Sequence, residues 1–542
     1  MCGIFAILGN MNGGLRISRA LCDRGPDGFR CEEFFGRAFL GFTRLHITGD
    51  DRGGMQPFHR RMGNGQAVLL CNGEFYGHEM TKQGKETSDC AAILDVFEAA
   101  NGSIEDTLAM LMCNGSEYAL LLLYKADDDD KVHVYAARDQ WGTRPLFISA
   151  NSEPLLYFAS EMKAFTHVEM QQLEPGTIYE CIIDGKGRRS DTRTSRINYD
   201  VVRSHMSNGM NLAEQLAAAV QRRLHCTTGK IGCLLSGGLD SSLVAALAAK
   251  ALRSKGGECG NLYTYTIGLT ADAPDVLFAE QVASHIGSIH KTFIVTKEYA
   301  LSRLQEVIIA IESWDTTTVR ASTMQYILAE RVAEDGCKCI LTGDGADEVF
   351  CGYKYFANAP SSCIAREERD RLLSEIHLFD GLRADRTLAA HGIEANFPFL
   401  DVNFVDFVKT RIPDNVLWQR GRIEKWVLRD AFVGSGLLPE IVIMRKKEAF
   451  SDGVSVSEDS WYAICGKEAA ARWQWINAHA APKDIEVPLW AVGLAKTEEQ
   501  AYYLYVYTQV YGSMHIPHYW LPKWCGDTFE PSARTIEVVA DD

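Results

Sequence analysis

The strongest constraint on the fold is a change of sequence pattern part-way along the chain. Up to about residue 183 the apolar segments are short or alternating, and clusters of Gly, Asn and Asp separate them. That pattern is typical of β-strands joined by turns. Between residue 231 and residue 341, strand-like and helix-like segments alternate instead, which predicts a parallel, doubly wound sheet. Because 542 residues exceed the ~250–300 that one core usually serves, we expect at least two domains.

The pattern divides the chain into four parts. Residues 1–183 form a mostly β domain, and a polar segment rich in Gly, Arg and Ser, 184–209, connects it to the next domain. Residues 210–516 form an α/β domain that becomes mainly helical after about residue 365, and 517–542 form an irregular tail. The predicted strands of the first part are 68–71, 118–124, 132–136 and 145–149. In the second domain, strands 231–235, 262–267, 291–295 and 338–341 alternate with helices 242–253, 276–286, 299–311 and 321–334.

Composition limits the class of protein. The formal net charge of -16 argues against general affinity for nucleic acid or an anionic membrane. No early apolar run resembles a signal peptide, and no stretch approaches the ~20 apolar residues of a spanning helix. We therefore expect a cytoplasmic protein whose 16 scattered cysteines stay reduced. Cys337 and Cys339 are interpreted as buried hydrophobic residues rather than half of a metal site, and Asp127–Asp130 as a solvated hairpin tip.

The most specific motif is Ser236-Gly237-Gly238-Leu239-Asp240-Ser241-Ser242, between a predicted strand and a predicted helix. Two glycines let the backbone approach an anion closely, and the helix N-terminus directs its unpaired N–H groups at that anion. The serine hydroxyls can add donors, and Asp240 can hold Mg²⁺. The run lacks the Gly-Lys-Ser/Thr of a P-loop. It resembles the pyrophosphate loop of enzymes that cleave ATP between the α- and β-phosphates; the alternative is a glycine turn that only caps a helix.

A second loop, Thr342-Gly343-Asp344-Gly345-Ala346-Asp347-Glu348, also follows a predicted strand. In a parallel sheet, ligands bind beyond the carboxyl ends of the strands, so both loops should face one crevice. Carboxylates beside a pyrophosphate loop most simply indicate Mg²⁺ coordination and proton handling. The alternative is a solvated acidic turn.

Cys2 points to a separate chemistry, because only Met1 precedes it. If Met1 is removed, one residue carries both a nucleophilic thiol and a free α-amine. An α-amine titrates near pH ~7.7–8.0, so part of it is a neutral base at cell pH. We therefore expect Met1 to be absent from the active protein.

Further motifs in the first domain accompany Cys2 in order: Arg24-Gly25-Pro26-Asp27, Arg44-Leu45, Gln56-Pro57, Asn72-Gly73-Glu74, Ser88-Asp89 and Ala159-Ser160-Glu161-Met162-Lys163. Together they resemble the glutamine amidotransferases of the N-terminal-nucleophile class, which implies an α+β domain of layered antiparallel sheets with helices. Asn72 and the Gly73 N–H can donate to the oxyanion formed by attack on a carboxamide. Arg44 can clamp the α-carboxylate of glutamine, and Glu74 and Asp89 can accept from its α-ammonium.

Over nearly its whole length the chain resembles the glutamine-hydrolysing asparagine synthetases. The second half carries Thr317–Ser322, Asp347–Tyr353, Phe397–Asp401, Lys447–Val454 and Pro531–Arg534. The resemblance implies that glutamine gives a Cys2 thioester and ammonia, and that ammonia crosses between domains to displace AMP from β-aspartyl-AMP. It further implies an adenylate pocket lined by Leu235, Ile267, Thr342 and Gly343, with Asp240 and Asp347 as Mg²⁺ ligands. Lys447 would reach the phosphates, Asp344 would serve the ammonia step, and Thr318 and Arg320 would bind aspartate.

Four residues depart from the family pattern: Asp23 for His, Asp344 for Glu, Arg386 for Lys and Asn396 for Arg. They bear on rate and inter-domain coupling more than on reaction class. Two alternatives remain open from sequence: a relative that modifies another acid on the same scaffold, and a non-catalytic glutamine-binding protein. The intact Cys2, pyrophosphate loop and Lys447 favour the synthetase. We expect small-molecule substrates (glutamine, aspartate and ATP), and the sequence leaves open whether the chain forms a homodimer.

Overall fold

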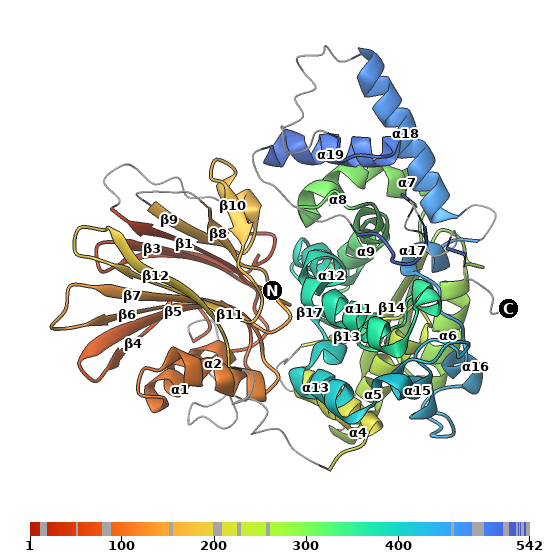
Figure 1. Ribbon diagram of the computed structural model, residues 1–542, viewed down its shortest axis with the longest axis horizontal. Coiled ribbons are helices and arrows are strands. Elements are labelled where there is room, and N and C mark those ends of the chain that lie inside the picture. The colour runs from red at the N-terminus through yellow and green to blue at the C-terminus, as the bar shows by residue number, and fades with distance from the viewer. Residues whose placement is uncertain are drawn as a thin grey trace.

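The structure is a computed structural model with two bodies, joined along a broad interface (Figure 1). It describes residues 1–10, 19–49, 53–77, 88–150, 155–198, 209–224, 229–255, 261–456, 460–479, 493–512, 520–526, 529–530, 532 and 536–537. In Figure 1 the N-terminal body is red to yellow and the C-terminal body is yellow to blue, and the N-terminus lies between them.

Two six-stranded antiparallel sheets form the N-terminal domain, in the orders β10-β8-β9-β1-β3-β2 and β12-β11-β7-β6-β5-β4. Alternation along each strand explains the layers, since successive side chains point to opposite faces. Ile4, Ala6 and Leu8 of the first sheet pack against Val68 and Leu70 of the second. The strands are β1 (Gly3–Gly9), β2 (Gly28–Phe34), β3 (Ala38–Arg44), β4 (Phe58–Met62), β5 (Gly65–Glu74), β6 (Glu117–Ala126), β7 (Val132–Arg138), β8 (Phe147–Ser149), β9 (Leu155–Ala159), β10 (Met170–Gln172), β11 (Thr177–Ile183) and β12 (Arg189–Arg196).

The four strands predicted in this domain are confirmed as β5, β6, β7 and β8, and Asp127–Asp130 lies at the predicted turn between β6 and β7. The outer face of the second sheet packs under two helices, α1 (Ile93–Ala99) and α2 (Ile104–Cys113). These layers match the α+β class that the resemblance implied.

The first domain extends beyond its predicted end at residue 183. β12 lies within the segment predicted to be a connection, and it pairs with β11 along the edge of the second sheet. Its sequence, Arg-Ser-Asp-Thr-Arg-Thr-Ser-Arg, is polar at every position and largely exposed. An edge strand with both faces exposed has no alternation of apolar and polar residues. The sequence of β12 therefore resembles that of a linker.

A five-stranded parallel sheet, in the order β15-β14-β13-β16-β17, forms the centre of the second domain. Its strands are β13 (Ile231–Leu234), β14 (Leu262–Gly268), β15 (Ile289–Ile294), β16 (Cys339–Leu341) and β17 (Glu394–Asn396). The helices that alternate with them are α4 (Leu212–Arg223), α5 (Leu239–Lys255), α6 (Pro274–Ile286), α7 (Lys297–Ser302), α8 (Leu304–Ile311) and α9 (Thr316–Glu334). The predicted doubly wound α/β architecture is confirmed.

Two details of this domain differ from the prediction. The single helix predicted at 299–311 is two helices, because the N–H of Arg303 bonds to the Ala300 carbonyl three residues back and tightens the chain there. β17 was not predicted, since three residues are too few to show periodicity. It places Asn396 beside Leu341 at the end of β16.

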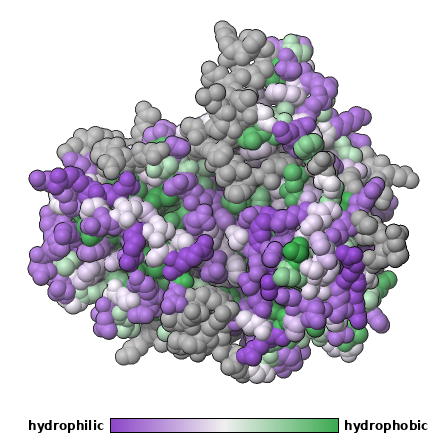
Figure 2. Space-filling model, in the orientation of Figure 1, coloured by the Kyte–Doolittle hydropathy of each residue, from purple (hydrophilic) through white to green (hydrophobic). Residues whose placement is uncertain are grey.

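The remainder of the chain is mainly helical, as predicted. Its helices are α10 (Ala346–Val349), α11 (Ser362–Glu375), α12 (Asp380–Ala389), α13 (Val402–Arg411), α14 (Asp414–Leu417), α15 (Trp426–Asp430), α16 (Glu440–Ile443), α17 (Phe450–Gly453), α18 (Trp461–His479) and α19 (Glu498–Tyr511). The tail residues that the structure describes carry no helix or strand. Among the described helices, none is both long and apolar enough to cross a membrane. Figure 2 shows a mostly hydrophilic face with small, scattered hydrophobic groups.

Candidate functional site

Cys2 lies immediately before β1, a fully buried strand between β3 and β9. Strand pairing fixes its backbone: the Ile4 N–H donates to Ser160 Oγ (3.0 Å), and Arg24 Nε donates to the Cys2 carbonyl (3.1 Å). The Leu45 N–H, 3.4 Å from Sγ, donates to the sulfur. The thiol is therefore held in place from both neighbouring strands.

The environment of Cys2 does not favour a free thiolate. Burial raises the pKa of its thiol to about 11, although the nearby N-terminal amine opposes that shift. Burial also lowers the pKa of the Met1 amine below its usual value. The base that Cys2 needs is its own amine, which becomes free only when Met1 is removed. The same buried surroundings would favour the neutral form of that amine, which is the form that can take the thiol proton.

Asn72 and Gly73 lie near the end of β5 and are shaped for an oxyanion. Both polar atoms of the Asn72 side chain are buried, and neither has a hydrogen-bond partner. Unsatisfied buried amides are rare and costly, which indicates a place for a polar ligand. A Cβ on Gly73 would lie 2.1 Å from the Glu117 carbonyl oxygen, so only glycine fits there.

Arg44, Glu74 and Asp89 are all buried in the same domain. Arg44 Nη2 donates to the Thr48 carbonyl (3.2 Å), and Asp89 accepts from the Phe75 N–H (2.7 Å). Burial raises the pKa of Glu74 well above its usual range, and the negative charge of Asp89 adds to this. An ammonium group that enters between these carboxylates would remove that repulsion, which fits the predicted binding of a glutamine α-amine.

The second domain supplies a carboxylate to this region. Glu394 of β17 also raises the pKa of Glu74, and its Oε2 lies 3.8 Å from the Met1 amine. Met1 is fully buried, and its sulfur contacts Arg144 Nη1 at 2.8 Å. Met1 therefore fills a space between the two domains.

The pyrophosphate loop has the predicted strand–loop–helix geometry, between β13 and α5. Gly237 has φ +67°, and a Cβ there would lie 2.4 Å from the backbone of Phe278, so glycine is required. The Ser236 and Ser241 hydroxyls lie 3.1 Å apart, and Ser236 Oγ accepts from the Gly238 N–H (3.3 Å). The loop thus presents hydroxyls and N–H groups at the N-terminus of a long helix, as an anion site requires.

Sequence reasoning missed the residue that supports this loop. Arg445 Nη1 donates to the Ser236 carbonyl (3.0 Å), and Arg445 Nη2 forms an ion pair with Asp275 (2.8 Å). The guanidinium also lies 4.3 Å from the centre of the Phe278 ring. Burial raises the pKa of Asp275 to about 6, an effect that its pairing with Arg445 opposes.

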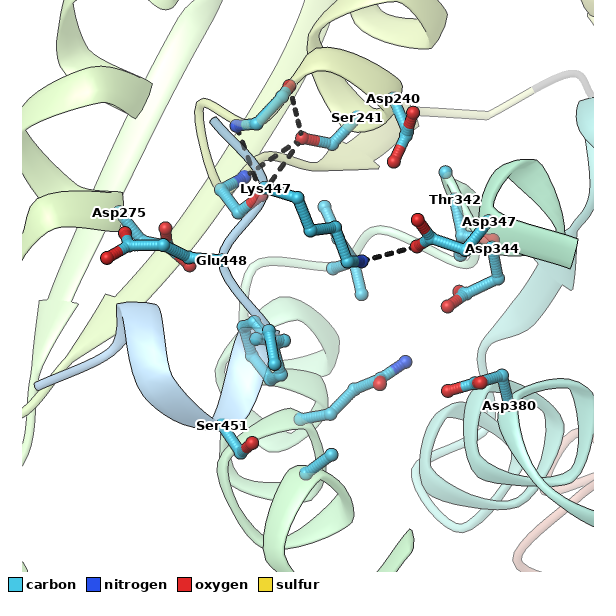
Figure 3. A pocket seen from close by; sticks show the side chains of 18 of the residues that line it. Asp240, Ser241, Asp275, Thr342, Asp344, Asp347, Asp380, Lys447, Glu448 and Ser451 are labelled. Atoms are coloured by element: carbon cyan, nitrogen blue, oxygen red, sulfur yellow. Dashed lines mark hydrogen bonds and ion pairs between the residues drawn. The ribbon is translucent and has the colours of Figure 1, made fainter. Parts of the chain in front are cut away.

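The pyrophosphate loop and the acidic loop meet, as predicted. A Cβ on Gly343 would lie 2.8 Å from the Ser241 nitrogen, so the two backbones touch. Asp240 and Asp347 share Lys425, whose Nζ lies 2.5 Å from Asp240 and 2.7 Å from Asp347. Lys447 lies in the segment between α16 and α17, and its ammonium forms an ion pair with Asp347 Oδ2, the oxygen that Lys425 does not contact (Figure 3). Although burial opposes it, the two ammonium groups hold the pKa of Asp347 well below its usual range.

Asp344 lies in a second charged cluster beside the first. It accepts from Arg383 (2.5 Å), which also pairs with Asp380. Burial raises the pKa of Asp344, and Arg383 opposes that shift. The carboxylates of Asp344, Asp347 and Asp380 lie on the same side of the cavity in Figure 3.

The surroundings of Glu348 favour its protonated form. The Tyr353 hydroxyl lies 2.6 Å from both Glu348 Oε1 and Asp380 Oδ2, yet a phenol has one proton to donate. The second contact requires a protonated carboxyl, and burial together with Asp380 raises the pKa of Glu348 well above its usual range. Neutral Glu348 satisfies both short contacts.

The two residues predicted to bind aspartate are separated. Thr318, at the start of α9, lines the cavity. Arg320 does not: its guanidinium forms paired contacts with Glu499 (2.6 and 2.9 Å) and with Glu530. One helix turn cannot direct both side chains into the cavity. Instead, the buried side-chain atoms without a hydrogen-bond partner on this side of the cavity include Thr317 Oγ1 and Gln325 Nε2.

These groups surround one cavity of about 230 Å³. The predicted residues that line it are Leu235, Ser236, Gly238, Asp240, Ser241, Ile267, Thr318, Thr342, Gly343, Asp344, Asp347 and Lys447. Gly237 shapes the loop from behind, and the buried Ser242 hydroxyl has no hydrogen-bond partner. The residues that sequence reasoning missed are Asp275, Gln325, Glu348, Tyr353, Asp380, Arg383, Lys425 and Arg445. Of these, Glu348 and Tyr353 lay in a recognised motif, Asp347–Tyr353, but neither was assigned a role.

A short path connects the two sites. Tyr76, two residues after Glu74, donates its hydroxyl to Asn396 Oδ1 across the domain interface (2.9 Å). The Asn396 carbonyl accepts from the Thr342 N–H (3.0 Å), and Thr342 lines the cavity. Asn396 is one of the departures from the family pattern, and its short side chain leaves room for this contact.

Comparisons with known proteins match both domains of the chain. The glutamine amidotransferase domain model matches residues 1–199, which includes β12, and the asparagine synthase model matches 211–375 and 365–473. The human and bovine proteins named asparagine synthetase [glutamine-hydrolyzing] are each 35% identical to this chain, over 99% of it and 98% of each relative. A solved glutamine phosphoribosylpyrophosphate amidotransferase from B. subtilis is 14% identical, with a TM-score of 0.29 over 54% of this chain and 91% of that one.

The fold and the two sites define a two-domain class of protein, in which a glutamine amidotransferase domain is joined to a synthetase domain. More particularly, the chain belongs to the family of glutamine-hydrolysing asparagine synthetases.

We predict that active protein lacks Met1, because a peptide bond to Met1 removes the free amine that Cys2 needs as a base. Intact-mass measurement of protein with glutaminase activity should therefore give the mass without methionine. An active preparation in which Met1 is retained throughout would contradict the role of the amine.

We predict that Tyr76→Phe weakens the coupling between the two sites. The change leaves Asn396 Oδ1 without its donor, at a cost of about 1–3 kcal/mol for a buried acceptor. Asparagine formed per glutamine consumed should fall, while ammonia-dependent synthesis is retained. Tyr124→Phe is the matched control, because the Tyr124 hydroxyl donates to Asn64 Oδ1 within the first domain. An equal fall in both variants would exclude a coupling role for Tyr76.

Proposed function

We propose that this chain converts aspartate to asparagine with ATP and with ammonia taken from glutamine, releasing AMP and pyrophosphate. The observation that carries the proposal is the pairing of two equipped sites in one chain. Cys2 lies in the domain with the unpartnered Asn72 amide, and the pyrophosphate loop meets a carboxylate–lysine cluster in the other domain. A glutamine-binding protein without catalysis would need neither set of groups.

In the first domain, the Cys2 sulfur attacks the carboxamide carbon of glutamine, and the α-amine of Cys2 takes the thiol proton. The oxyanion accepts hydrogen bonds from Asn72 Nδ2 and the Gly73 N–H. The amine returns its proton to the leaving nitrogen, so ammonia departs and a glutamyl thioester remains. Water then hydrolyses the thioester to glutamate and restores the thiol. Arg44 holds the α-carboxylate of glutamine, and Glu74 and Asp89 hold its α-ammonium.

In the second domain, a side-chain oxygen of aspartate attacks the α-phosphorus of ATP, and pyrophosphate leaves. Ammonia then attacks the acyl carbon of β-aspartyl-AMP, AMP departs, and the extra proton passes to a base. Asp344 is the carboxylate best placed for that proton, and neutral Glu348 can donate within the same cluster. Thr317 and Gln325 supply donors for aspartate. Thr318 lines the same part of the cavity, but its hydroxyl donates to Asp315 (2.7 Å). Lys447 offsets negative charge on the phosphates.

The residues present fit Mg²⁺ bound together with ATP. Asp240 Oδ1 is buried without a partner, and carboxylate oxygens are the ligands that Mg²⁺ prefers. Asp240 and Asp347 are already balanced by Lys425 and Lys447, so the cluster gains little from a bare cation and more from a cation that arrives with phosphates. Mg²⁺ held by Asp240 and Asp347 would neutralise charge on the phosphate oxygens. Lys425 keeps the two carboxylates close enough to act together.

Ammonia has a buried route between the sites. Removal of Met1 would vacate the space beside Arg144 and Glu394, which lies between Cys2 and β17. β17 adjoins β16, whose C-terminal end carries Thr342 and Asp344. Arg144, Glu394 and Asn396 are all buried, so a small solute that passed beside them would be shielded from bulk solvent. That the protein is cytoplasmic stays a prediction. Whether it forms a homodimer stays open, and light scattering of the purified chain would decide it.

We predict that Cys2→Ala abolishes glutamine-dependent synthesis and spares ammonia-dependent synthesis, since the two reactions use separate domains. The assay supplies ATP, Mg²⁺ and either glutamine or ammonium, with and without aspartate, and measures AMP, pyrophosphate and asparagine. Wild-type protein should form all three only when aspartate is present. Pyrophosphate without asparagine, or release driven by another acid, would overturn the proposal. Loss of both activities in a folded Cys2→Ala variant would contradict separate sites.

We predict that Asp344→Ala still binds ATP but forms asparagine at least about tenfold more slowly, because general acid–base groups contribute ~10²–10⁴-fold. Asp344→Glu should retain substantial activity, since it keeps the carboxylate that pairs with Arg383. Asp344→Asn is the matched control, being equal in size without the charge. If Asp344→Asn has unchanged kinetics, Asp344 only stabilises the turn.

A further inference from the structure

A second cavity, of about 450 Å³, adjoins the first. The two share one wall, formed by Tyr353, Lys354, Lys425, Lys446 and Lys447. That wall lies at the end of the first cavity where Asp240 and Asp347 hold Lys425 and Lys447. The residues at the predicted adenylate end, Leu235 and Ile267, line the first cavity alone. The second cavity therefore begins where the phosphates of a bound nucleotide would lie.

The lining of the second cavity is strongly basic. Its described residues include six cations: Lys354, Arg420, Arg422, Lys425, Lys446 and Lys447. Glu424 is the one carboxylate among these lining residues, and it is already engaged, with Arg429 (2.5 Å) and with the Lys447 N–H (2.6 Å). In a chain with a net charge of -16, such a concentration of positive charge indicates an anionic ligand.

The cations lie at two depths: we call Lys425 and Lys447, which are less exposed, the floor, and the exposed Arg422 and Lys446 the rim. Lys425 and Lys447 on the floor pair with Asp240 and Asp347. Arg422 and Lys446 on the rim are exposed, and neither forms an ion pair with any residue that the structure describes. An anion that moves outward would pass from cations shared with carboxylates to cations with no carboxylate partner.

We propose that the second cavity binds inorganic pyrophosphate after ATP cleavage, as a separate holding site on its way out. The inference rests on the proposed function, which makes pyrophosphate the leaving product. Pyrophosphate is small and highly charged, and it matches a site that offers six cationic side chains. Because the wall is shared, the ion reaches Arg422 and Lys446 without leaving cationic surroundings.

The aromatic residues of the cavity favour an inorganic ion over a nucleotide. Arg422 lies 4.5 Å from the centre of the Trp426 ring, so one face of that ring is covered. The Trp418 indole N–H is held by the Phe356 carbonyl (3.1 Å). A base that stacked here would have to displace the guanidinium, whereas a phosphate group would bind it.

The test measures binding of radiolabelled pyrophosphate to the full chain by equilibrium dialysis, with Mg²⁺ and saturating α,β-methylene-ATP. This analogue fills the first cavity and cannot be cleaved between its α- and β-phosphates. We expect one pyrophosphate per chain to remain bound, and AMP at the same concentration not to displace it. If the analogue or AMP displaces all the pyrophosphate, the second site does not exist.

The rim is tested with the double variant Arg422→Ser/Lys446→Ser. It should weaken pyrophosphate binding at least about tenfold, since each hydrogen bond to a charged group contributes roughly a factor of ten. Inhibition of synthesis by added pyrophosphate should weaken with it. Because Lys446 also lines the first cavity, the single variant Arg422→Ser, at a residue that lines the second cavity alone, is measured beside it and should leave the KM for ATP little changed. Lys186→Ser/Arg196→Ser is the matched control, because it removes the same charge from an exposed part of the first domain.

Wild-type affinity in the folded rim variant would overturn the proposal. Binding of labelled pyrophosphate does not require asparagine synthesis. The binding assay can therefore exclude a pyrophosphate site in a protein that still makes asparagine. It can also support that site if the synthesis assay shows that another acid is the substrate.

Discussion

Buried arginine–carboxylate pairs hold the two domains in one relative position, and both sites depend on that position. Arg24 of the first domain pairs with Glu161 (2.5 Å) and with Asp385 of the second (2.8 Å). Arg386 of the second domain also forms an ion pair with Glu161 (3.2 Å). Breaking one member of such a pair leaves an uncompensated buried charge, at a cost of about 3–5 kcal/mol. The interface therefore has few alternative arrangements, and Glu394 stays beside the Cys2 region while Asn396 stays beside Tyr76.

The contiguous motifs could be predicted from the sequence, because their chemistry is local. The pyrophosphate loop needs one strand end, two glycines and one helix start, and these lie within a dozen residues of one another. The partners that complete each site could not be found in this way. Lys425 and Arg383 come from segments where Lys and Arg are common, and only folding brings them to Asp347 and Asp344. Arg320 shows the reverse: it lies in a recognised motif, yet Glu499 and Glu530 hold it away from the cavity.

The fold was predictable to the same extent and for the same reason. Buried parallel strands and the helices between them have strong apolar patterns, so the alternation from β13 to β16 could be recognised. β12 is polar throughout because it lies at an edge, and β17 has three residues. Both escaped prediction, although β17 carries Glu394 and Asn396, which lie closest to the link between the domains.

The pairing of charges across the interface also restricts how such a chain can change. Glu117 of the first domain pairs with Arg223 of the second (2.8 Å), and Arg223 pairs in turn with Asp401 (3.0 Å). A substitution at one of these positions leaves the charge of its partner buried without an opposite charge. A tolerated substitution in one domain should therefore be accompanied by a compensating substitution in the other. A chimera that joins this amidotransferase half to the synthetase half of a distant relative would inherit mismatched sets. Such a chimera would fold and couple its two sites only if the interface residues of both domains came from the same parent. The residues of the interface, more than those of either site, would therefore have to be kept together as a set.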